Sequence, residues 1–417
     1  MDNILIILTD RYPFSNGETY VETERPYWSK YDHVYICPVL VRKEDRIRSN
    51  FTAMPHETVV STEDFKPGFF DALKGLIGYV SFWDYFYELK ALKNTRRLSA
   101  RNIRSMFVMG IFSNLRAKRI EAVIKSYLGK SETETVLLYS YWMYEPALVS
   151  IGLKKSFPSA KLISRAHGYD LYEERQKNRY VPFRHLVLGS MDRIYPISEN
   201  GRMYLHNQYH GKYDEKIEVR RLGTKRAFDL SNDRRDTGKF TIVSCSNLVP
   251  LKRVDRIVEA LKMYDGDVEW VHFGDGELMD SLRSQAGKLP SRIHAHFMGR
   301  VPNEDVQRFY STYWIDVFVN VSETEGVPVS IMEAQSYGIP VIATDVGGTS
   351  EIVINGENGV LLNKSFSNEE LLGAFEDVIK NREKYRTEAF RTWERLSDAN
   401  KLYEEFFTRE LNALMAD

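Results

Sequence analysis

Two glutamates, Glu325 and Glu333, stand in one stretch with seven residues between them. A carboxylate there can accept hydrogen bonds from two hydroxyl groups of a sugar ring. Pro328 lies between them and marks the expected start of a helix. Proline is favoured there because the backbone N–H that it lacks would have no partner within the helix. The free N–H groups and partial positive charge of a helix start suit a phosphate group. The stretch therefore combines hydroxyl acceptors with a phosphate site, as a sugar nucleotide requires.

Buried strands and a helix must position these carboxylates. The apolar residues 315–321 have the length of a buried strand, and residues 340–344 form a second such run. Between these runs we expect a helix from Pro328 to about Tyr337, with Gly338 as its stop signal. Glycines 347 and 348 then predict a turn into another short helix, so that two helix N-termini open near the same strand edge.

The paired glutamates around Gly-x-Pro resemble the signature of the retaining glycosyltransferases of family 4, which include bacterial capsule, exopolysaccharide and O-antigen enzymes. The resemblance implies the α/β GT-B fold, in which two Rossmann-like domains face a central cleft and a C-terminal helix crosses back to the N-terminal domain. It also implies transfer of a sugar from a UDP- or GDP-sugar to a saccharide or lipid-linked acceptor in surface polysaccharide biosynthesis, without a metal or another cofactor. A sugar-nucleotide epimerase of the same fold and a non-catalytic sugar-nucleotide-binding protein remain as alternatives.

The resemblance also assigns roles to the residues of this stretch. By resemblance, Glu333 binds the ribose hydroxyls of the donor, while Lys252 and the helix start at Pro328 hold its diphosphate. Glu325 and the backbone N–H groups of Gly326 and Val327 would orient the donor sugar.

Other positions match the family pattern less completely. The Arg-x-x-x-x-Lys pattern is met by Lys252 but has Asn247 in place of its arginine. Arg253 is the candidate for the missing cation, since a cation beside a helix start suits a diphosphate. Gly274 begins a Gly-Asp-Gly loop that resembles the family's loop beside the nucleotide. By the same resemblance, the backbone of Arg300 would meet the base.

The first half of the chain opens with a predicted buried strand at residues 4–8, then a loop and a helix near Thr19. This loop lacks the G-x-G-x-x-G spacing, which argues against an NAD enzyme. By resemblance Gly17 faces the donor phosphates, and a plain turn glycine is the alternative.

A strand at residues 161–166 delivers His167 to the carboxyl edge, where open parallel sheets bind ligands. The resemblance puts this histidine near the donor sugar and the reacting centre. The catalytic candidates are Glu325, His167 and Lys252.

Two series of alternating strands and helices predict two domains. Further strands are expected at residues 33–39, 136–141, 192–197, 240–244, 268–273, 294–298 and 358–362. The polar residues 226–238 lack periodicity and are interpreted as the interdomain linker. We therefore expect one domain at 1–225 and another at 239–392, and by resemblance the first binds the acceptor and the second binds the nucleotide sugar. By resemblance, residues 393–417 return to the first domain, within a helix expected around residues 391–414.

Composition restricts the compartment and the partners. The 417 residues are 43% hydrophobic, which is enough for two cores, and a net charge of −1 shows no nucleic-acid footprint. Cys37 and Cys245 lie in strand-like runs, which favours buried thiols in a reducing compartment. No Cys/His cluster has zinc spacing, and the Asp-x-Asp at residues 265–267 is interpreted as a turn. The N-terminus lacks a basic signal region and no apolar run reaches membrane-span length, so we expect a cytoplasmic protein.

Residues 65–130 differ from the rest of the chain in charge. They contain 13 Lys and Arg but only four Asp and Glu, a balance of +9. The early part of this segment holds a cluster of nine aromatic residues, namely Phe65, Phe69, Phe70, Tyr79, Phe82, Trp83, Tyr85, Phe86 and Tyr87. Aromatics beside cations suit peripheral contact with an anionic membrane, at the inner face of the plasma membrane for this protein. A solvated helix face over a local aromatic core explains the same composition equally well.

Overall fold

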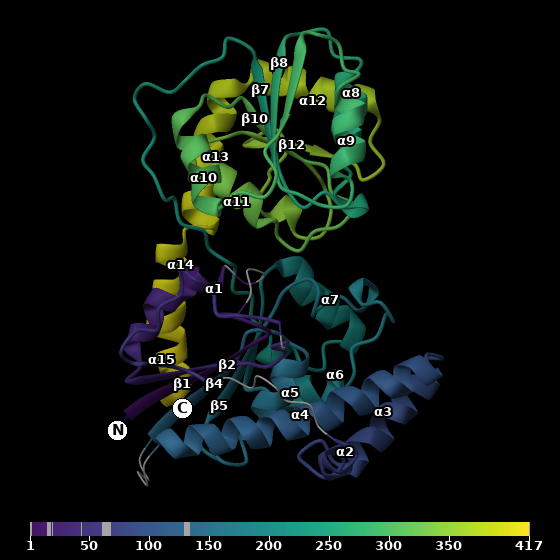
Figure 1. The fold of residues 1–417 in the computed structure, drawn as a ribbon, viewed down its shortest axis with the longest axis vertical. Coiled ribbons are helices and arrows are strands. Elements are labelled where there is room, and N and C mark those ends of the chain that lie inside the picture. The colour runs from purple at the N-terminus through teal and green to yellow at the C-terminus, as the bar shows by residue number, and fades with distance from the viewer. Residues whose placement is uncertain are drawn as a thin grey trace. The chain divides into compact units, whose positions relative to one another are not determined.

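The structure of the protein is a computed structural model. It describes every residue except Met1, 15–17, Thr19, Lys43, 61–67, 129–133 and Asp417. Figure 1 shows two α/β units. Unit 1 comprises Met1–Ile197, Gly201–Arg220 and Tyr403–Asp417, and unit 2 comprises Ser198–Asn200 and Arg221–Leu402. The sequence analysis placed the domain boundaries at residues 225 and 393, whereas the units of the structure change over at Arg221 and Tyr403.

Unit 1 is built on a six-stranded parallel sheet in the order β3-β2-β1-β4-β5-β6. Its strands are β1 (Asp2–Thr9), β2 (His33–Pro38), β3 (Glu57–Val59), β4 (Glu134–Ser140), β5 (Lys161–Ala166) and β6 (Arg193–Pro196). Apolar runs such as Ile4–Leu8 are fully buried because helices cover parallel strands on both faces. Chain order reverses between β1 and β4, and ligands of open parallel sheets bind where the order reverses, beyond the carboxyl ends of the strands.

The helices of unit 1 connect its strands. They are α1 (Val21–Glu24), α2 (Phe69–Gly75), α3 (Phe82–Asn94), α4 (Ala100–Tyr127), α5 (Glu145–Leu153), α6 (Arg184–Ser190) and α7 (Glu199–Tyr209). The long α4 packs against α5, α2 and α3. Ser81 caps α3 and forms a capping box with Asp84. Gly110 of α4 touches α3, where a Cβ would lie 2.3 Å from the Tyr85 hydroxyl. This glycine therefore lets the two helices approach closely.

Unit 2 repeats the architecture with the order β12-β11-β10-β7-β8-β9. Its strands are β7 (Phe240–Cys245), β8 (Val268–Phe273), β9 (Ile293–Phe297), β10 (Val317–Asn320), β11 (Val341–Thr344) and β12 (Gly359–Leu362). Its helices are α8 (Asp255–Leu261), α9 (Met279–Ala286), α10 (Asn303–Thr312), α11 (Val329–Ser336), α12 (Asn368–Lys380), α13 (Arg382–Leu396) and α14 (Ala399–Glu405), the last of which continues into unit 1. Here chain order reverses between β7 and β10. The expected two-domain α/β fold is thus confirmed.

Two expectations about connections need correction. Residues 226–238, interpreted as a linker, lie along unit 2, where the Arg235 backbone N–H donates to Thr312 O at 2.8 Å. The single helix expected around residues 391–414 is interrupted after α13, because Ser397 and Ala399 pair with the backbone of Thr224 instead of continuing it. The chain then continues as α14, a π-helical turn at Phe406–Glu410 and α15 (Leu411–Ala416).

The C-terminal segment of unit 1 is held by aromatic and ionic contacts. Phe406 packs edge-to-face on Tyr195 of β6 at 5.0 Å between ring centroids. It also lies under the guanidinium of Arg165, 4.9 Å from ring centroid to Cζ. Arg165 is fully buried and pairs with Glu24 at 3.0 Å. The Arg165 guanidinium of β5 is therefore paired with a carboxylate inside the unit. Its contact with the Phe406 ring helps to hold the C-terminal segment in place.

Candidate functional site

In unit 2 an ion pair joins the ends of the two strands between which the chain order reverses. Lys252 follows β7 in a short 3-10 turn, and Glu325 follows β10. The Lys252 ammonium lies 2.6 Å from Oε1 of Glu325. Asn320 donates to the same oxygen at 3.3 Å, and Glu325 is 9% exposed. The structure therefore brings together two of the three predicted catalytic residues and leaves them at the sheet edge where a ligand is expected.

Gly347 fixes the loop that carries Glu325. Its φ of +59° is a conformation that favours glycine, and a Cβ there would lie 1.9 Å from the carbonyl oxygen of Glu325. The neighbouring Gly348 donates its N–H to Gly326 O at 2.6 Å. Pro328 directly precedes α11 as its N-cap, and Val327 is buried before it. Close backbone contact thus holds the predicted phosphate-binding loop against the end of β11.

Glu333 lies on α11 and is held by a chain of side-chain amides. It accepts a hydrogen bond from Asn303 Nδ2 at 2.8 Å. The oxygen of that amide in turn accepts from Gln307 Nε2 at 2.8 Å, and Gln307 accepts from the Tyr337 hydroxyl at 3.0 Å. Burial raises the pKa of Glu333 to about 7, against the lowering effect of Asn303. The carboxyl is thus oriented and ready to accept further hydrogen bonds.

The other two residues of the predicted diphosphate pattern, Arg253 and Asn247, do not join the Lys252–Glu325 pair. Arg253, at φ +49°, donates to Val321 O at 2.8 Å and Lys364 O at 2.7 Å. Burial lowers its pKa. Its guanidinium is therefore directed to backbone carbonyls, whereas Lys252 is directed to Glu325. Asn247 is exposed, and its carbonyl accepts the N–H of Val249 at 3.0 Å.

Gly274 draws the ends of three strands together. Its φ is +135°, and a Cβ there would lie 1.8 Å from Ser246 O. Its N–H donates to Gly299 O at 2.9 Å, just before the exposed Arg300. The loops after β7, β8 and β9 are thereby packed backbone against backbone, as expected of a loop that lies close to a ligand.

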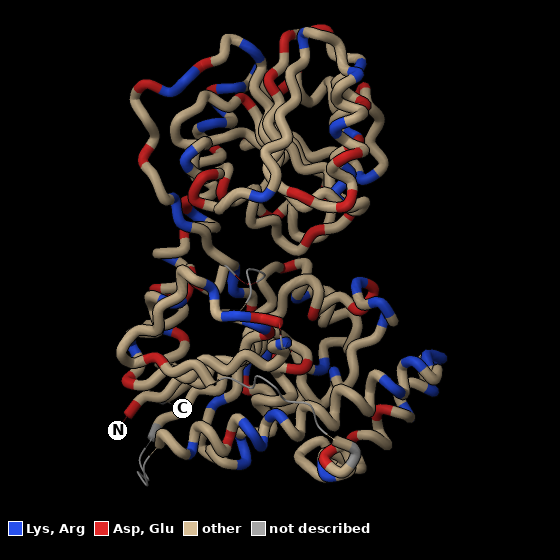
Figure 2. Tube along the Cα trace, in the orientation of Figure 1, with Lys and Arg blue, Asp and Glu red and all other residues tan. Residues whose placement is uncertain are grey.

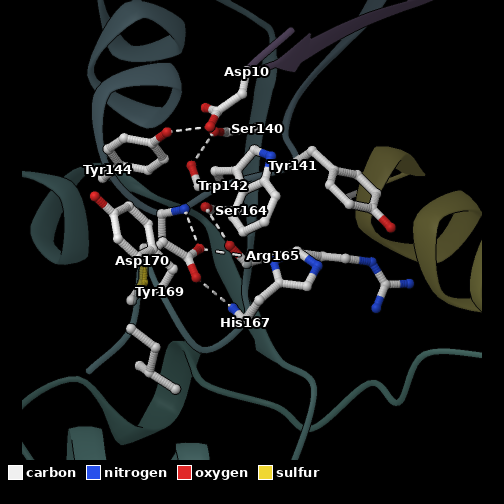
Figure 3. Close-up of polar contacts among 12 residues, drawn as sticks. Asp10, Ser140, Tyr141, Trp142, Tyr144, Ser164, Arg165, His167, Tyr169 and Asp170 are labelled. Carbon is white, nitrogen blue, oxygen red and sulfur yellow. Dashed lines mark hydrogen bonds and ion pairs between the residues drawn. The ribbon is translucent and has the colours of Figure 1, made fainter. Parts of the chain in front are cut away.

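In unit 1 the predicted catalytic residue His167 follows β5 and is 6% exposed (Figure 3). Its backbone N–H donates to Asp170 Oδ1 at 2.8 Å, and Met143 N donates to the other oxygen of that carboxylate at 2.8 Å. Asp170 thus ties the ends of β4 and β5 together. The imidazole lies against Trp142, 4.6 Å between ring centroids, and neither ring nitrogen has a hydrogen-bond partner among the described residues. The predicted glycine, Gly17, lies outside the described residues.

Asp10, which the sequence analysis did not single out, directly follows β1. Its Oδ2 accepts the hydroxyl of Tyr144, which follows β4 (Figure 3). Burial, reinforced by the nearby charge of Glu18, raises the pKa of Asp10 to about 8. An acidic residue straight after a predicted strand is the only signal that could have indicated this position.

Glu18 organises the loop around Asp10. It accepts the backbone N–H groups of Arg11 and Tyr12, each at 2.7 Å, and the indole N–H of Trp142 at 2.6 Å. The backbone N–H of Asp10 donates to it as well, at 3.1 Å, so this 3% exposed carboxylate is well satisfied. It therefore fixes Trp142 beside Asp10 and His167.

In the positively charged segment, residues 65–130, some aromatic side chains are exposed and others face the core of unit 1. Tyr85 is buried, and Tyr79 is partly buried against the unit 1 core. The exposed aromatic residues are Phe70, Phe82, Trp83, Phe86, Tyr87 and Tyr127, of which Phe82 is 74% exposed. Phe65 and the side chain of Phe69 lie outside the described residues. Within the described part of the chain, no helix combines the length and apolar character needed to cross a bilayer.

Among the described residues, no group of three or more His, Cys, Asp or Glu side chains is arranged so that it could hold a metal ion. Asp265 of the Asp-x-Asp sequence has a fully exposed side chain, 3.3 Å from Arg292. The carbonyl of Asp267 accepts the N–H of Phe240 at 3.0 Å, so these residues lie in the connection that leads into β8.

Comparison with known proteins gives matches in sequence and in fold. Residues 226–389 match the family model for glycosyl transferases group 1. The uncharacterized glycosyltransferase MJ1178 of Methanocaldococcus jannaschii is 28% identical over 274 residues, which are 64% of this chain and 73% of that protein. The O-antigen biosynthesis glycosyltransferase WbnH of Escherichia coli is 33% identical over 119 residues, 28% of this chain and 31% of the relative. The alignment thus spans about a third of the O-antigen relative.

The fold has known counterparts over its full length. Anabaena HepE, solved in complex with UDP, matches 100% of both chains with a TM-score of 0.63 at 16% identity. The fold is therefore of the GT-B type, and the family match in sequence lies within unit 2. Membership of the retaining family 4 stays a prediction.

Proposed function

We propose that the protein is a retaining glycosyltransferase that takes its sugar from a nucleoside diphosphate sugar bound in unit 2. The observation that carries the proposal is the Lys252–Glu325 pair, placed where the sheet order reverses and inside the stretch that matches group 1 glycosyltransferases. The UDP bound by the structural neighbour HepE supports a nucleotide donor. The name of the relative WbnH supports a product in polysaccharide biosynthesis.

The residues of unit 2 have distinct proposed roles. Glu333, oriented by Asn303, accepts the ribose hydroxyls. Lys252 and the N-terminus of α11 stabilise the negative charge that grows on the diphosphate as it leaves. Glu325 directs the Lys252 ammonium in the free protein and orients the donor sugar once it is bound. Charge on the leaving group is met by this cation and the helix start, so the proposal needs no metal.

Nucleotide binding tests this assignment directly. Glu333→Ala should weaken binding of UDP or GDP, measured by titration calorimetry, by about 1.5–3 kcal/mol, the range for a hydrogen bond to a charged group. Glu304→Ala, an exposed glutamate on the neighbouring α10, is the matched control and should bind as wild type does. Unchanged affinity in Glu333→Ala would contradict the ribose assignment.

Turnover separates this function from the alternatives. A sugar-nucleotide epimerase would convert its donor without an acceptor, and a binding protein would convert nothing. We expect release of the nucleoside diphosphate to depend on an added saccharide or lipid-linked acceptor. Acceptor-independent epimerisation, or tight binding without turnover, would favour one of the other two functions.

The surface of α2 and α3 favours an acceptor held at a membrane. The exposed rings of Phe82, Trp83 and Tyr87 share this part of unit 1 with cations. The exposed cations here include Lys90 and Lys93 of α3, Arg96 of the connection, and Arg101 and Arg104 of α4, and Figure 2 shows Lys and Arg gathered where the two helices join. Arg101 also lines one groove with Lys177 and Arg179. We propose that this surface binds an anionic bilayer at the inner face of the plasma membrane.

Vesicle sedimentation tests the membrane surface. Binding should increase with anionic lipid content and fall with added salt, because such attraction is screened over about 8 Å at physiological ionic strength. Reversing Lys93, Arg96, Arg101 and Arg104 to Glu should abolish it, whereas reversing Lys262, Lys288, Lys380 and Lys401 of unit 2 should not. If wild type does not sediment with anionic vesicles at low salt, the membrane proposal fails. The segment would then be a solvated helix face, and the acceptor would be soluble.

A further inference from the structure

A cavity of about 260 Å³ in unit 2 is lined by three arginines, Arg226, Arg234 and Arg386. Arg226 and Arg234 belong to the segment that leads into β7, and Arg386 belongs to α13. Figure 1 shows that segment on the side of unit 2 where α13 lies. Because a guanidinium keeps its proton at neutral pH, three positive charges from two elements line one cavity.

The cavity lies at the amino-terminal edge of the unit 2 sheet. Arg234 comes shortly before β7, Trp314 before β10, and Gly338, which also lines the cavity, before β11. These three strands are neighbours in the sheet. Lys252 and Glu325 follow β7 and β10 at the opposite edge, and the four residues of β10, at about 3.3 Å each, separate the two edges by about 13 Å. The cavity is therefore distinct from the proposed donor site.

Two of the guanidinium groups, those of Arg234 and Arg386, lie near each other without a carboxylate partner. Both lie over the indole of Trp314, with Cζ 4.5 Å and 4.3 Å from the ring centroid. Within the part of the chain that the structure describes, neither has a carboxylate at ion-pair distance. Burial, followed by the positive charge of Arg234, lowers the pKa of Arg386 to about 10. A bound anion would relieve this repulsion between like charges.

The carboxylates around the cavity are exposed or already paired. Arg226 lies 3.3 Å from Asp229, whose side chain is 99% exposed. Asp316 pairs with Arg382 at 2.8 Å, and Glu383 is exposed on α13. An ion pair with a fully exposed partner contributes little to stability, so Arg226 can exchange Asp229 for a bound anion at small cost.

The charge and the size of the cavity select the kind of anion. The planar fork of a guanidinium matches the oxygens of a phosphate, and a phosphate monoester carries between about −1.5 and −2 charges near pH 7. It balances three arginines better than a single carboxylate does. Leu230 and Phe390 add apolar surface, and Phe390 lies under Arg226, 5.5 Å from ring centroid to Cζ. The volume is below the range of sites for drug-sized molecules, which favours a small phosphate monoester over a complete nucleotide sugar.

We propose that Arg226, Arg234 and Arg386 bind the phosphate group of a small phosphate monoester at the amino-terminal edge of the unit 2 sheet. The organic part of the ligand lies against Leu230 and Phe390. This second anion site goes beyond the proposed glycosyl transfer and does not depend on it, because no residue that lines it belongs to the proposed donor site.

Titration calorimetry on the full chain tests the site. The probes are inorganic phosphate and phenyl phosphate, with acetate as the comparison and sodium chloride to hold the ionic strength constant. We expect each phosphate probe to bind saturably, one per chain, and acetate not to bind. The double variant Arg226→Gln with Arg234→Gln should weaken phosphate binding at least tenfold.

Matched variants separate the site from general charge and from the donor site. Arg391→Gln with Arg395→Gln removes the same charge from exposed positions of α13 and should bind phosphate as wild type does. Lys252→Ala should also bind phosphate normally, because Lys252 lies at the opposite edge. The melting temperature reports whether each variant is folded. If the double cavity variant is unfolded, Arg234→Gln alone should still weaken binding at least threefold.

Three results would overturn the inference. Wild type binds neither phosphate probe, or binds acetate equally well. The folded cavity variants bind phosphate as wild type does. Phosphate binding is lost in Lys252→Ala instead, which would place the phosphate at the donor edge. Titration of the same wild-type sample with UDP reports on the proposed function, so that a failure of one proposal is distinguishable from a failure of the other.

Discussion

Each unit places a polar pair where the order of its sheet reverses, but the two pairs have different chemistry. In unit 2 a cation, Lys252, meets Glu325 between the ends of β7 and β10. In unit 1 an acid, Asp10, meets the phenol of Tyr144 between the ends of β1 and β4. The fold therefore determines where a ligand can bind, and the residues at the strand ends determine which ligand it is.

The two edges also differ in where their cations lie. Unit 1 buries Arg165 completely against Glu24 and leaves carboxyl and aromatic groups at its edge. Unit 2 keeps Lys252 at the edge and adds the N-terminus of α11. One edge thus offers a cation and a helix N-terminus, and the other offers carboxyl and aromatic groups. Substitutions at the two edges should accordingly have separable effects.

Removal of the cation should produce the largest effect. Lys252→Ala should lower kcat about 100-fold or more, with a smaller change in donor KM, since charge on the diphosphate is greatest in the transition state. Steady-state kinetics with a donor that supports turnover would measure this. Lys288→Ala, an exposed lysine of the same unit, is the control. A pure increase in KM would mean that Lys252 only binds the ground state, and would remove the proposed contrast in chemistry.

A backbone substitution should have an intermediate effect that is confined to unit 2. Gly347→Ala places a methyl group 1.9 Å from Glu325 O at a left-handed φ, so it should displace the loop and lower both stability and nucleotide affinity. Gly356→Ala has a similar φ of +75° with open space around its Cβ, and should lose only about 1 kcal/mol from backbone strain. Thermal unfolding and UDP titration of both variants measure the difference. Equal losses would show that contact between the two loops is unimportant.

The sequence analysis was accurate where local patterns carry the information. Buried apolar runs predicted the strands of both sheets, except β3, whose three residues are too few to show a pattern. The motif around Glu325 could be found because its glycines, proline and carboxylates are neighbours in sequence. The structure added that Lys252, some seventy residues earlier, pairs with Glu325.

The site in unit 1 could not be predicted in the same way. Glu18, Trp142 and His167 come from three separate connections, and only folding brings them together. Asp10 gains its unusual character from burial near Glu18, which no single-residue pattern indicates. The break after α13 likewise depends on Thr224, a distant partner. Long-range contacts of this kind are what sequence periodicity does not encode.

The smallest expected effect concerns the ionisation of Asp10. Burial and Glu18 raise its pKa to about 8 from 3.8, with Asp170 adding to the rise and Tyr144 and Arg11 opposing it. The folded protein therefore keeps a proton that the unfolded chain loses, so stability falls as pH rises from about 4 to about 8 and then levels off.

Asp10→Asn removes this dependence. Its melting temperature relative to wild type should therefore rise across that window. Asp233→Asn, on the exposed surface of unit 2, should show a constant difference. A constant difference for Asp10→Asn as well would mean that Asp10 is ionised near neutral pH.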